Sequence, residues 1–305
     1  MTRTLTSAAT LLLAATLAAC SPLSVVNAVS PGRATQAASA LRYGPDARNV
    51  LDVYHPPGQA GQDGKAPVIV FFYGGNWVSG ERAEYAYVGR ALAARGFVVV
   101  VPDYRLYPQV RYPDFLDDAA QAVAWTEREI ARYGGDPDKV FLMGHSAGAY
   151  NAAMLALDER WLGKQGIKPA SLRGWIGLAG PYDFLPVENR TTRPVFDYPF
   201  TKAETQPVNH VGKGAPPALL IAGRKDETVN PERNTGGMAQ KLRAAGVPVR
   251  EVYYDGVGHA GLVASLSSTL KRIAPTLDAV EDFVCSDGGR VSAGGTCRRT
   301  SDPAR

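Results

Sequence analysis

Residues 140–148 read Val-Phe-Leu-Met-Gly-His-Ser-Ala-Gly, and a helical pattern follows over residues 147–157. The apolar run at the start of this stretch is typical of a buried strand. A strand that turns at once into a helix needs small residues two positions before and two positions after the turn, and Gly144 and Gly148 provide them. We therefore predict that Ser146 lies at a sharp, strained turn with its hydroxyl group exposed at the carboxyl end of a sheet.

The same alternation of strand and helix extends over most of the chain. Further strands are expected at residues 50–54, 67–72, 97–101, 172–178, 218–222 and 247–254. Further helices are expected at residues 83–95, 113–133, 231–245 and 261–283. The runs at 68–72 and 98–101 are apolar without alternation, as in strands that are covered on both faces. Strand–helix–strand units of this spacing predict an α/β fold with a mostly parallel central sheet flanked by helices on both faces.

The composition is typical of a globular protein. Of the 305 residues, 45% are hydrophobic and 20% are charged, whereas disordered chains have fewer apolar residues and membrane bundles have fewer charges. The 33 basic and 29 acidic residues give a net charge of +4, and no segment has the basic stripe that nucleic-acid binding requires. Four histidines and three cysteines leave little material for a zinc site, and we expect neither a metal nor an organic cofactor.

A serine nucleophile requires a base that takes its proton, and in folds of this kind an acid and then a histidine follow the serine along the chain. Asp226 comes just after the predicted strand that ends at residue 222, and His259 follows the last predicted strand. Both side chains are expected to meet Ser146 at one edge of the sheet. Glu227 and Asp255 are the alternatives to Asp226 as the acid, since Asp226 could also be an ordinary loop carboxylate.

The other histidines are expected to have structural roles. His145 lies inside the turn, where its side chain should point away from the Ser146 hydroxyl group. His55 ends an early strand, and His210 lies in a stretch without periodicity over residues 181–214. That stretch carries several aromatic side chains, which either pack against the core or line a pocket.

A glycine-containing loop provides the third component of a catalytic site. Tyr73-Gly74-Gly75-Asn76-Trp77 follows the predicted strand at 67–72. Adjacent glycines let the backbone approach a substrate closely. The N–H groups of Gly75 and Asn76, with that of Ala147 after the serine, are expected to form an oxyanion hole. The alternative is a glycine turn without a catalytic role.

Together these pieces resemble the α/β-hydrolases of the carboxylesterase type, near the feruloyl-esterase-like and hormone-sensitive-lipase-like groups. The resemblance covers residues 40–284 and includes Asp103-Tyr104-Arg105-Leu106, which is expected to support the glycine loop. It implies an α/β-hydrolase fold and a serine carboxylesterase in which His259 deprotonates Ser146 and Asp226 orients His259. The implied partner is a small-molecule ester with a short-chain or aryl group.

Two residues depart from the pattern of these families. Tyr73 stands where lipase relatives usually have a histidine that serves as a structural hydrogen bonder, and Asn76 replaces a third glycine. The Asn76 side chain is expected to narrow the pocket beside the oxyanion. An amidase, arylformamidase or peptidase with the same triad is the first alternative, and a non-catalytic envelope lipoprotein of this fold is a remote one.

The N-terminus has the features of an export signal. Arg3 precedes an apolar run over residues 8–19 that is too short to span a bilayer. The end of this run, Leu17-Ala18-Ala19-Cys20, resembles the lipobox of bacterial lipoproteins, and the alternative is an ordinary signal peptide that happens to end in cysteine. The resemblance implies a signal peptide over residues 1–19 and a lipidated Cys20. The residues that follow are small and polar, which predicts that residues 20–39 hold the lipidated cysteine and a flexible tether.

We therefore expect a protein of the cell envelope that is anchored by lipid to a bacterial membrane. Ser21 after the cysteine is compatible with the outer membrane, where the protein would face the periplasm or the surface. Outside the cytoplasm the remaining cysteines, Cys285 and Cys297, are expected to form a disulfide rather than a reactive or metal-binding site. This bond would close a tail over residues 285–305 behind the catalytic domain at 40–284.

Overall fold

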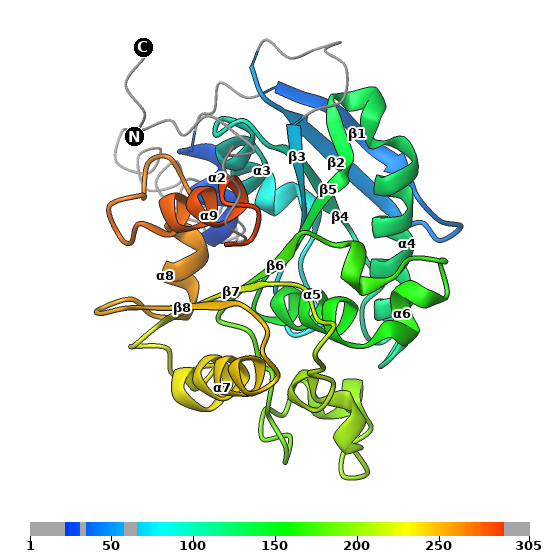
Figure 1. Ribbon diagram of the computed structural model, residues 1–305, viewed down its shortest axis with the longest axis vertical. Helices are drawn as coiled ribbons and strands as arrows, with labels where there is room; N and C mark the ends of the chain where they lie inside the picture. The colour runs from blue at the N-terminus through cyan, green and yellow to red at the C-terminus, as the bar shows by residue number, and fades with distance from the viewer. Residues whose placement is uncertain (1–21, 31–34, 58–65, 290–305) are drawn as a thin grey trace, which may run out of the picture.

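The computed structural model describes residues 22–30, 35–57 and 66–289, and Figure 1 shows their arrangement. These residues form a sheet with the strand order β1-β2-β4-β3-β5-β6-β7-β8. The strands are β1 (Thr35–Arg42), β2 (Val50–His55), β3 (Ala66–Phe72), β4 (Val98–Pro102), β5 (Gly135–His145), β6 (Gly174–Leu178), β7 (Ala218–Gly223) and β8 (Val249–Tyr254). β2 is antiparallel to both β1 and β4, and all the other pairings are parallel. The expected α/β fold with a mostly parallel central sheet is confirmed.

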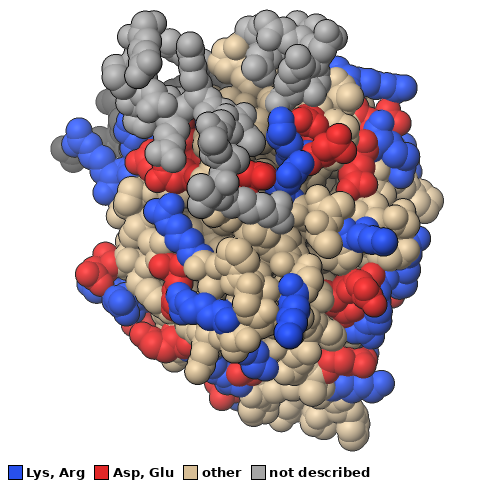
Figure 2. Space-filling view, viewed as in Figure 1, with Lys and Arg blue, Asp and Glu red and all other residues tan. Residues whose placement is uncertain are grey.

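Helices cover both faces of this sheet. The longer ones are α3 (Ala86–Ala93), α4 (Asp114–Glu129), α5 (Ala147–Leu157), α7 (Gly237–Ala244) and α9 (Thr276–Cys285). In Figure 1, α4, α5 and α6 (Glu159–Gly163) lie on one side of the sheet, and α3 and α9 lie on the other. Because both faces are covered, every residue of β3 and β4 is buried. On the face of the molecule shown in Figure 2, acidic and basic side chains are intermingled.

The order of the strands determines where a site can form. The chain passes from β3 to its neighbour β4 and then returns to β5 on the other side of β3. At the carboxyl ends of these strands, Phe72 of β3 is in register with Gly144 of β5. The loop after β3 and the turn after β5 therefore leave the sheet side by side. In open α/β sheets ligands bind at such a reversal of the strand order.

Residues 20–39, which were expected to form a flexible tether, contain regular secondary structure. This segment includes helix α2 (Pro22–Ala28) and the start of edge strand β1. The Asn27 side chain donates to the Ala83 carbonyl oxygen at 3.0 Å, and Arg90 donates to the Asn27 carbonyl oxygen at 3.1 Å. Small polar residues suit an edge strand as well as a linker, so composition alone does not separate the two. The folded part of the chain therefore begins before residue 40.

The predicted signal peptide and Cys20 lie outside the described residues. None of the helices within the described ranges is long and apolar enough to cross a membrane.

A second difference concerns the helix expected over residues 261–283. The structure divides it into α8 (His259–Ala264) and α9, with turns between them. Pro275 stands immediately before α9, and the residue before a proline is disfavoured in a helix. Cys285 ends α9 and is 3% exposed, whereas Cys297 lies outside the described residues. The pairing of these two cysteines stays a prediction.

The aromatic side chains of residues 181–214 divide into two groups. Phe196 is 2% exposed, and its ring centroid lies 4.8 Å from that of Trp77. The ring centroids of Phe184 and Phe196 are 5.1 Å apart. Tyr198 and Phe200 are instead 43% and 77% exposed. The insert is therefore packed through its inner aromatic residues onto the loop after β3.

Candidate active site

The turn between β5 and α5 has the strained geometry expected of a nucleophilic serine. Ser146 has φ 54° and ψ −123°, a conformation that residues with side chains rarely adopt. Its N–H donates to the Leu178 carbonyl oxygen at 2.9 Å, which joins the turn to β6. A Cβ atom on Gly144 would overlap the Gly148 backbone, and one on Gly148 would overlap the Phe72 carbonyl oxygen. Both glycines are therefore required by the close approach of backbone segments around the serine.

Asp226 and His259 form a hydrogen-bonded pair between the loops after β7 and β8. His259 Nδ1 lies 2.7 Å from Asp226 Oδ2. The other carboxylate oxygen accepts from the N–H groups of Thr228 and Val229 at 2.9 and 2.8 Å. The Asp226 side chain has no exposed surface, and 18% of the His259 side chain is exposed. Because an ionised carboxylate only accepts hydrogen bonds, Nδ1 carries the proton and Nε2 is left as a base.

The structure brings neither of the alternative acids into contact with the imidazole ring. Asp255 is at the surface, where its carboxylate lies 3.1 Å from Arg224 Nε. Glu227 is exposed and lines the cavity beside Ser146. Asp226 is thus the carboxylate that orients His259.

The remaining histidines occupy different environments. His55 Nδ1 contacts the Pro56 carbonyl oxygen at 2.8 Å, and His210 Nε2 lies 2.7 Å from the Glu204 carbonyl oxygen. His145, in contrast, is buried at the site itself, against the loop that carries the base. Within the described part of the chain, no group of three or more His, Cys, Asp or Glu side chains could hold a metal ion.

The glycine loop after β3 lies against the serine turn. A Cβ atom on Gly74 would be only 3.0 Å from Ser146 Cβ. Gly75 has φ +127°, and a side chain there would overlap the Ser79 carbonyl oxygen. Asn76, Ser146 and Ala147 line one cavity. Asn76 of the loop and Ala147 of the turn, two of the predicted oxyanion-hole residues, therefore lie beside the serine in the same cavity, whereas Gly75 is not among the residues that line it.

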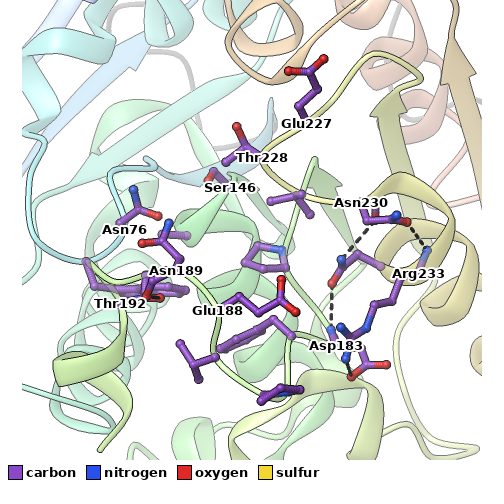
Figure 3. Close-up of a pocket in the computed structure, with 18 residues that line it drawn as sticks. Asn76, Ser146, Asp183, Glu188, Asn189, Thr192, Glu227, Thr228, Asn230 and Arg233 are labelled. Atoms are coloured by element: carbon purple, nitrogen blue, oxygen red, sulfur yellow. Dashed lines mark hydrogen bonds and ion pairs between the residues drawn. The ribbon is translucent and has the colours of Figure 1, made fainter. Parts of the chain in front are cut away.

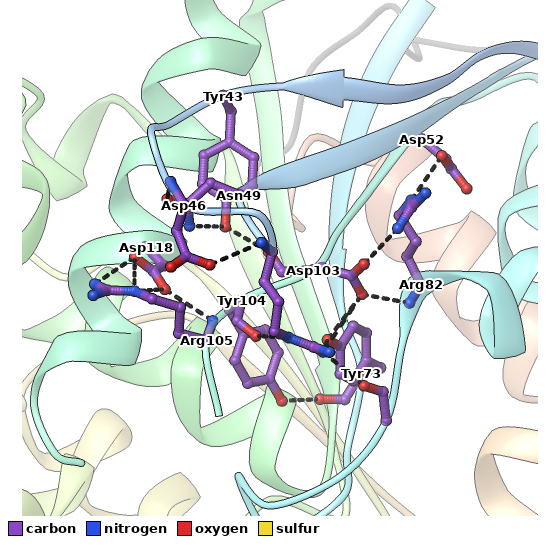
Figure 4. Close-up of polar contacts among 12 residues, drawn as sticks. Tyr43, Asp46, Asn49, Asp52, Tyr73, Arg82, Asp103, Tyr104, Arg105 and Asp118 are labelled. Atoms are coloured by element: carbon purple, nitrogen blue, oxygen red, sulfur yellow. Dashed lines mark hydrogen bonds and ion pairs between the residues drawn. The ribbon is translucent and has the colours of Figure 1, made fainter. Parts of the chain in front are cut away.

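A buried polar network supports this loop (Figure 4). Tyr73 OH donates to Asp103 Oδ1 at 3.0 Å, and the backbone and guanidinium N–H groups of Arg82 contact the same carboxylate at 2.7 and 2.5 Å. Tyr104 OH donates to the Tyr73 carbonyl oxygen at 2.8 Å, and Arg48 donates to Tyr73 OH at 2.8 Å. Burial raises the pKa of both tyrosines well above the ordinary value, so their hydroxyl groups stay protonated and can donate. Tyr73 therefore serves as a structural hydrogen bonder, and Asp103 and Tyr104 support the loop as expected.

The cavity beside the serine has a volume of 240 Å³. Trp77, Phe184 and Val187 form an apolar part of its wall. Its polar side chains, most of them labelled in Figure 3, come from the insert and from the chain after β7: Asp183, Glu188, Asn189, Thr192, Glu227, Thr228, Asn230, Arg233 and Asn234. Arg233 Nη2 lies 3.1 Å from Asp183 Oδ1, so the two side chains form an ion pair. The irregularity of residues 181–214 is the only sequence signal for the lining residues of the insert, and of those after β7 the sequence singles out only Glu227.

The chain is similar to proteins that are named esterases. Residues 51–242 match the family model described as BD-FAE. The chain is 32% identical to isoprenylcysteine alpha-carbonyl methylesterase ICME of Arabidopsis thaliana, with 74% of this chain and 57% of the relative covered. It is 31% identical to the esterase LipC of Mycobacterium tuberculosis, with 71% of this chain and 58% of the relative covered. The chain thus spans somewhat more than half the length of these curated relatives.

A solved structure supports the assignment of the fold. A truncated carbohydrate esterase from gut microbiota superposes with a TM-score of 0.69 at 19% identity, over 85% of this chain and 99% of that one. With the strand order and the serine turn, this likeness confirms the α/β-hydrolase fold.

Proposed function

The chain belongs to the BD-FAE family, and we propose that it is a serine carboxylesterase that acts on small carboxylic esters. The observation that carries this proposal is the hydrogen-bonded pair of Asp226 and His259 at the same sheet edge as the strained turn of Ser146. A serine–histidine–aspartate triad that performs acyl transfer is made of these three groups. Relatives named methylesterase and esterase favour an ester as the substrate.

In the proposed reaction, His259 Nε2 removes the proton of Ser146 Oγ while this oxygen attacks the ester carbonyl carbon. The N–H groups of Gly75, Asn76 and Ala147 stabilise the negative charge that develops on the carbonyl oxygen. The imidazole then gives its proton to the departing alcohol, which leaves an acyl group on the serine. A water molecule, deprotonated by the same imidazole, releases the carboxylic acid. The buried carboxylate beside the ring stabilises its protonated form in both halves of the cycle.

The size and lining of the cavity favour esters with a short-chain or aryl group. Its volume of 240 Å³ is below the roughly 300–1,000 Å³ that is typical of pockets for drug-sized ligands. Trp77 and Phe184 offer an apolar, aromatic surface, and Asn76 occupies space beside the serine. We therefore propose short-chain and aryl esters as the substrate class.

Turnover of p-nitrophenyl esters of increasing acyl length tests this proposal, with the matching aryl amides and formamides assayed in parallel. We expect turnover of the acetate and butyrate, a decline for longer chains and slower cleavage of the amides. Ser146→Ala should lower the rate by at least about 10,000-fold. Ser171→Ala is the matched control, because this exposed hydroxyl group donates to the Lys168 carbonyl oxygen at 2.8 Å, within its own surface turn.

The same assays decide between the alternatives. Faster cleavage of amides or formamides than of esters would identify an amidase, arylformamidase or peptidase. If no substrate were turned over in a reaction that depends on Ser146, the remaining alternative would be a non-catalytic envelope protein.

We also propose that the chain is exported and anchored by lipid on Cys20 after removal of residues 1–19. The support for this proposal is the apolar run and the Leu17-Ala18-Ala19-Cys20 ending. When the full chain is produced in bacteria with an alkyne fatty acid, we expect labelling and recovery in the membrane fraction. Cys20→Ala should abolish both, and an unlabelled parent protein would refute the anchor.

A disulfide between Cys285 and Cys297 is the third part of the proposal. Alkylation in denaturant without reduction should leave both thiols of the mature protein unmodified, and alkylation after reduction in the same denaturant should modify both. Cys297→Ser should leave one thiol, that of the buried Cys285, which reacts in denaturant without reduction. Full alkylation of the unreduced parent protein would refute the bond.

A further inference from the structure

The residue immediately before the proposed nucleophile contacts the residue that carries the proposed base. His145 ends β5 and is 5% exposed, and its Nε2 lies 3.1 Å from the His259 carbonyl oxygen. The two imidazole rings have centroids 4.8 Å apart and are inclined by 45°. This contact joins the strand that leads into Ser146 directly to the start of α8.

The geometry determines where His145 carries its proton. A carbonyl oxygen only accepts, so Nε2 must carry the hydrogen. Burial lowers the pKa of His145 well below its ordinary value, and the neighbouring His259 lowers it further, so the ring is neutral near pH 7. Nδ1 is consequently unprotonated and has no hydrogen-bond partner among the described residues. A neutral ring adds no positive charge beside His259 when that imidazole takes up a proton.

His259 is consequently held at two points. Its side chain is held by Asp226 through Nδ1 at 2.7 Å, and its backbone is held by His145 at 3.1 Å. The bond to Nδ1 sets the orientation of the ring, whereas the bond to the carbonyl oxygen sets the position of the chain that carries it. Gly74 lies against the same ring, since a Cβ atom there would be 3.2 Å from His145 Nδ1. His145 is therefore packed between the glycine loop and the base.

We propose that His145 is a positioning residue whose Nε2–H holds the His259 backbone so that the catalytic imidazole stays beside Ser146, an inference that rests on the proposed esterase function. The property that matters is the donor hydrogen rather than the shape of the ring. A misplacement of about 1 Å can lower a catalytic rate about 100-fold. Loss of the donor should therefore lower kcat and leave KM little changed.

Two substitutions separate the donor from the shape of the ring. His145→Phe keeps an aromatic ring of similar size and removes the donor, whereas His145→Gln keeps an N–H donor and removes the ring. His55→Phe is the matched control, because His55 is also buried at 8% exposure and contacts a carbonyl oxygen away from the site. Values of kcat and KM for a short aryl ester are measured for each variant. Thermal unfolding midpoints show that each variant is folded.

We expect kcat to fall about 10- to 100-fold in His145→Phe with KM within about 3-fold, and to recover to within about 5-fold of the parent value in His145→Gln. His55→Phe should keep the parent kcat. A fully active Phe variant, or a Gln variant less active than the Phe variant, would show that ring packing is what matters and would overturn the proposal. If His145→Phe does not fold, His145→Met supplies the donor-free comparison. A parent protein that hydrolyses no ester would instead refute the proposed function.

Discussion

The indole N–H of Trp77 donates to Asn151 Oδ1 at 3.0 Å, and both side chains are buried. Trp77 is the last residue of the glycine loop, whereas Asn151 lies in α5, the helix that begins just after Ser146. This bond therefore ties the loop with the proposed oxyanion donors to the helix under the proposed nucleophile. The two parts of the site are held together by side chains as well as by the register of β3 with β5.

Asn151→Leu should weaken both stability and turnover. The substitution leaves the Trp77 N–H buried without its acceptor, which typically costs about 1–3 kcal/mol in the free energy of unfolding. We expect kcat to fall as the loop loosens, while KM changes little. Urea unfolding and steady-state kinetics measure both effects.

A double-mutant cycle is the control for this prediction. Trp77→Phe removes the donor, so the double variant should lose less stability than the sum of the two single variants. Strictly additive losses would show that the two side chains do not interact.

Gly148→Ala should severely destabilise the protein. The new Cβ atom would overlap the Phe72 carbonyl oxygen, which belongs to a buried central strand. Forcing apart such backbone segments should cost about 3 kcal/mol or more in the free energy of unfolding. Gly163→Ala in α6 is the matched control, because a Cβ atom there meets nothing within 4 Å. That variant should be unchanged or gain up to about 1 kcal/mol by urea unfolding, and equal stabilities of the two variants would contradict the packing described for the serine turn.

Asn76→Gly should widen the range of acyl chains that the proposed esterase accepts. Asn76 lines the cavity and has φ 54°, a value that glycine adopts without strain. The substitution removes a side chain beside the serine and should raise the ratio of kcat/KM for a hexanoate ester to that for an acetate ester several-fold. Stability should be retained or slightly increased. An unchanged ratio would mean that Asn76 does not limit the acyl pocket.

His145 should make the stability of the protein depend on pH. Its pKa in the folded state is lowered well below the ordinary value, mainly by burial, whereas in the unfolded chain it is about 6.5. Below about pH 6.5 the unfolded state therefore binds a proton that the folded state does not. The stabilisation from a neutral His145 is present above this pH and is lost as the pH falls, by up to about 1.4 kcal/mol per pH unit.

Urea unfolding of the parent protein and of His145→Gln tests this dependence between about pH 7.5 and pH 5.5. The parent protein should lose stability relative to the variant as the pH falls through this range. Parallel stability curves would show that His145 does not titrate on unfolding.

Much of the site could be predicted because the strands are visible as apolar runs. Ser146, Asp226 and His259 each follow such a run, and the carboxyl ends of parallel strands meet at one edge of a sheet. The structure places His259 and Asp226 in direct contact, as their positions in the chain predict. The glycine loop was recognisable by its composition, because its backbone lies so close to neighbouring groups that side chains would not fit and glycines are needed.

Other features depend on tertiary contacts that no local pattern records. Residues 35–40 of edge strand β1 are small or polar, which also suits a linker. The break between α8 and α9 is the exception, since Pro275 is a local signal for it, although the apolar spacing continues across it. The role of His145 depends on a carbonyl group 114 residues away. Nothing in the sequence near either residue indicates that contact.

The central claim is that Ser146 is a nucleophile activated by His259. Incubation with a fluorophosphonate, followed by mass spectrometry of the intact protein and of its peptides, tests this claim most directly. We predict one phosphonyl group per chain, on the peptide that contains Ser146, with no labelling of Ser146→Ala and labelling at least about 1,000-fold slower in His259→Ala. Labelling at another residue, or undiminished labelling of Ser146→Ala, would contradict a serine mechanism at this site.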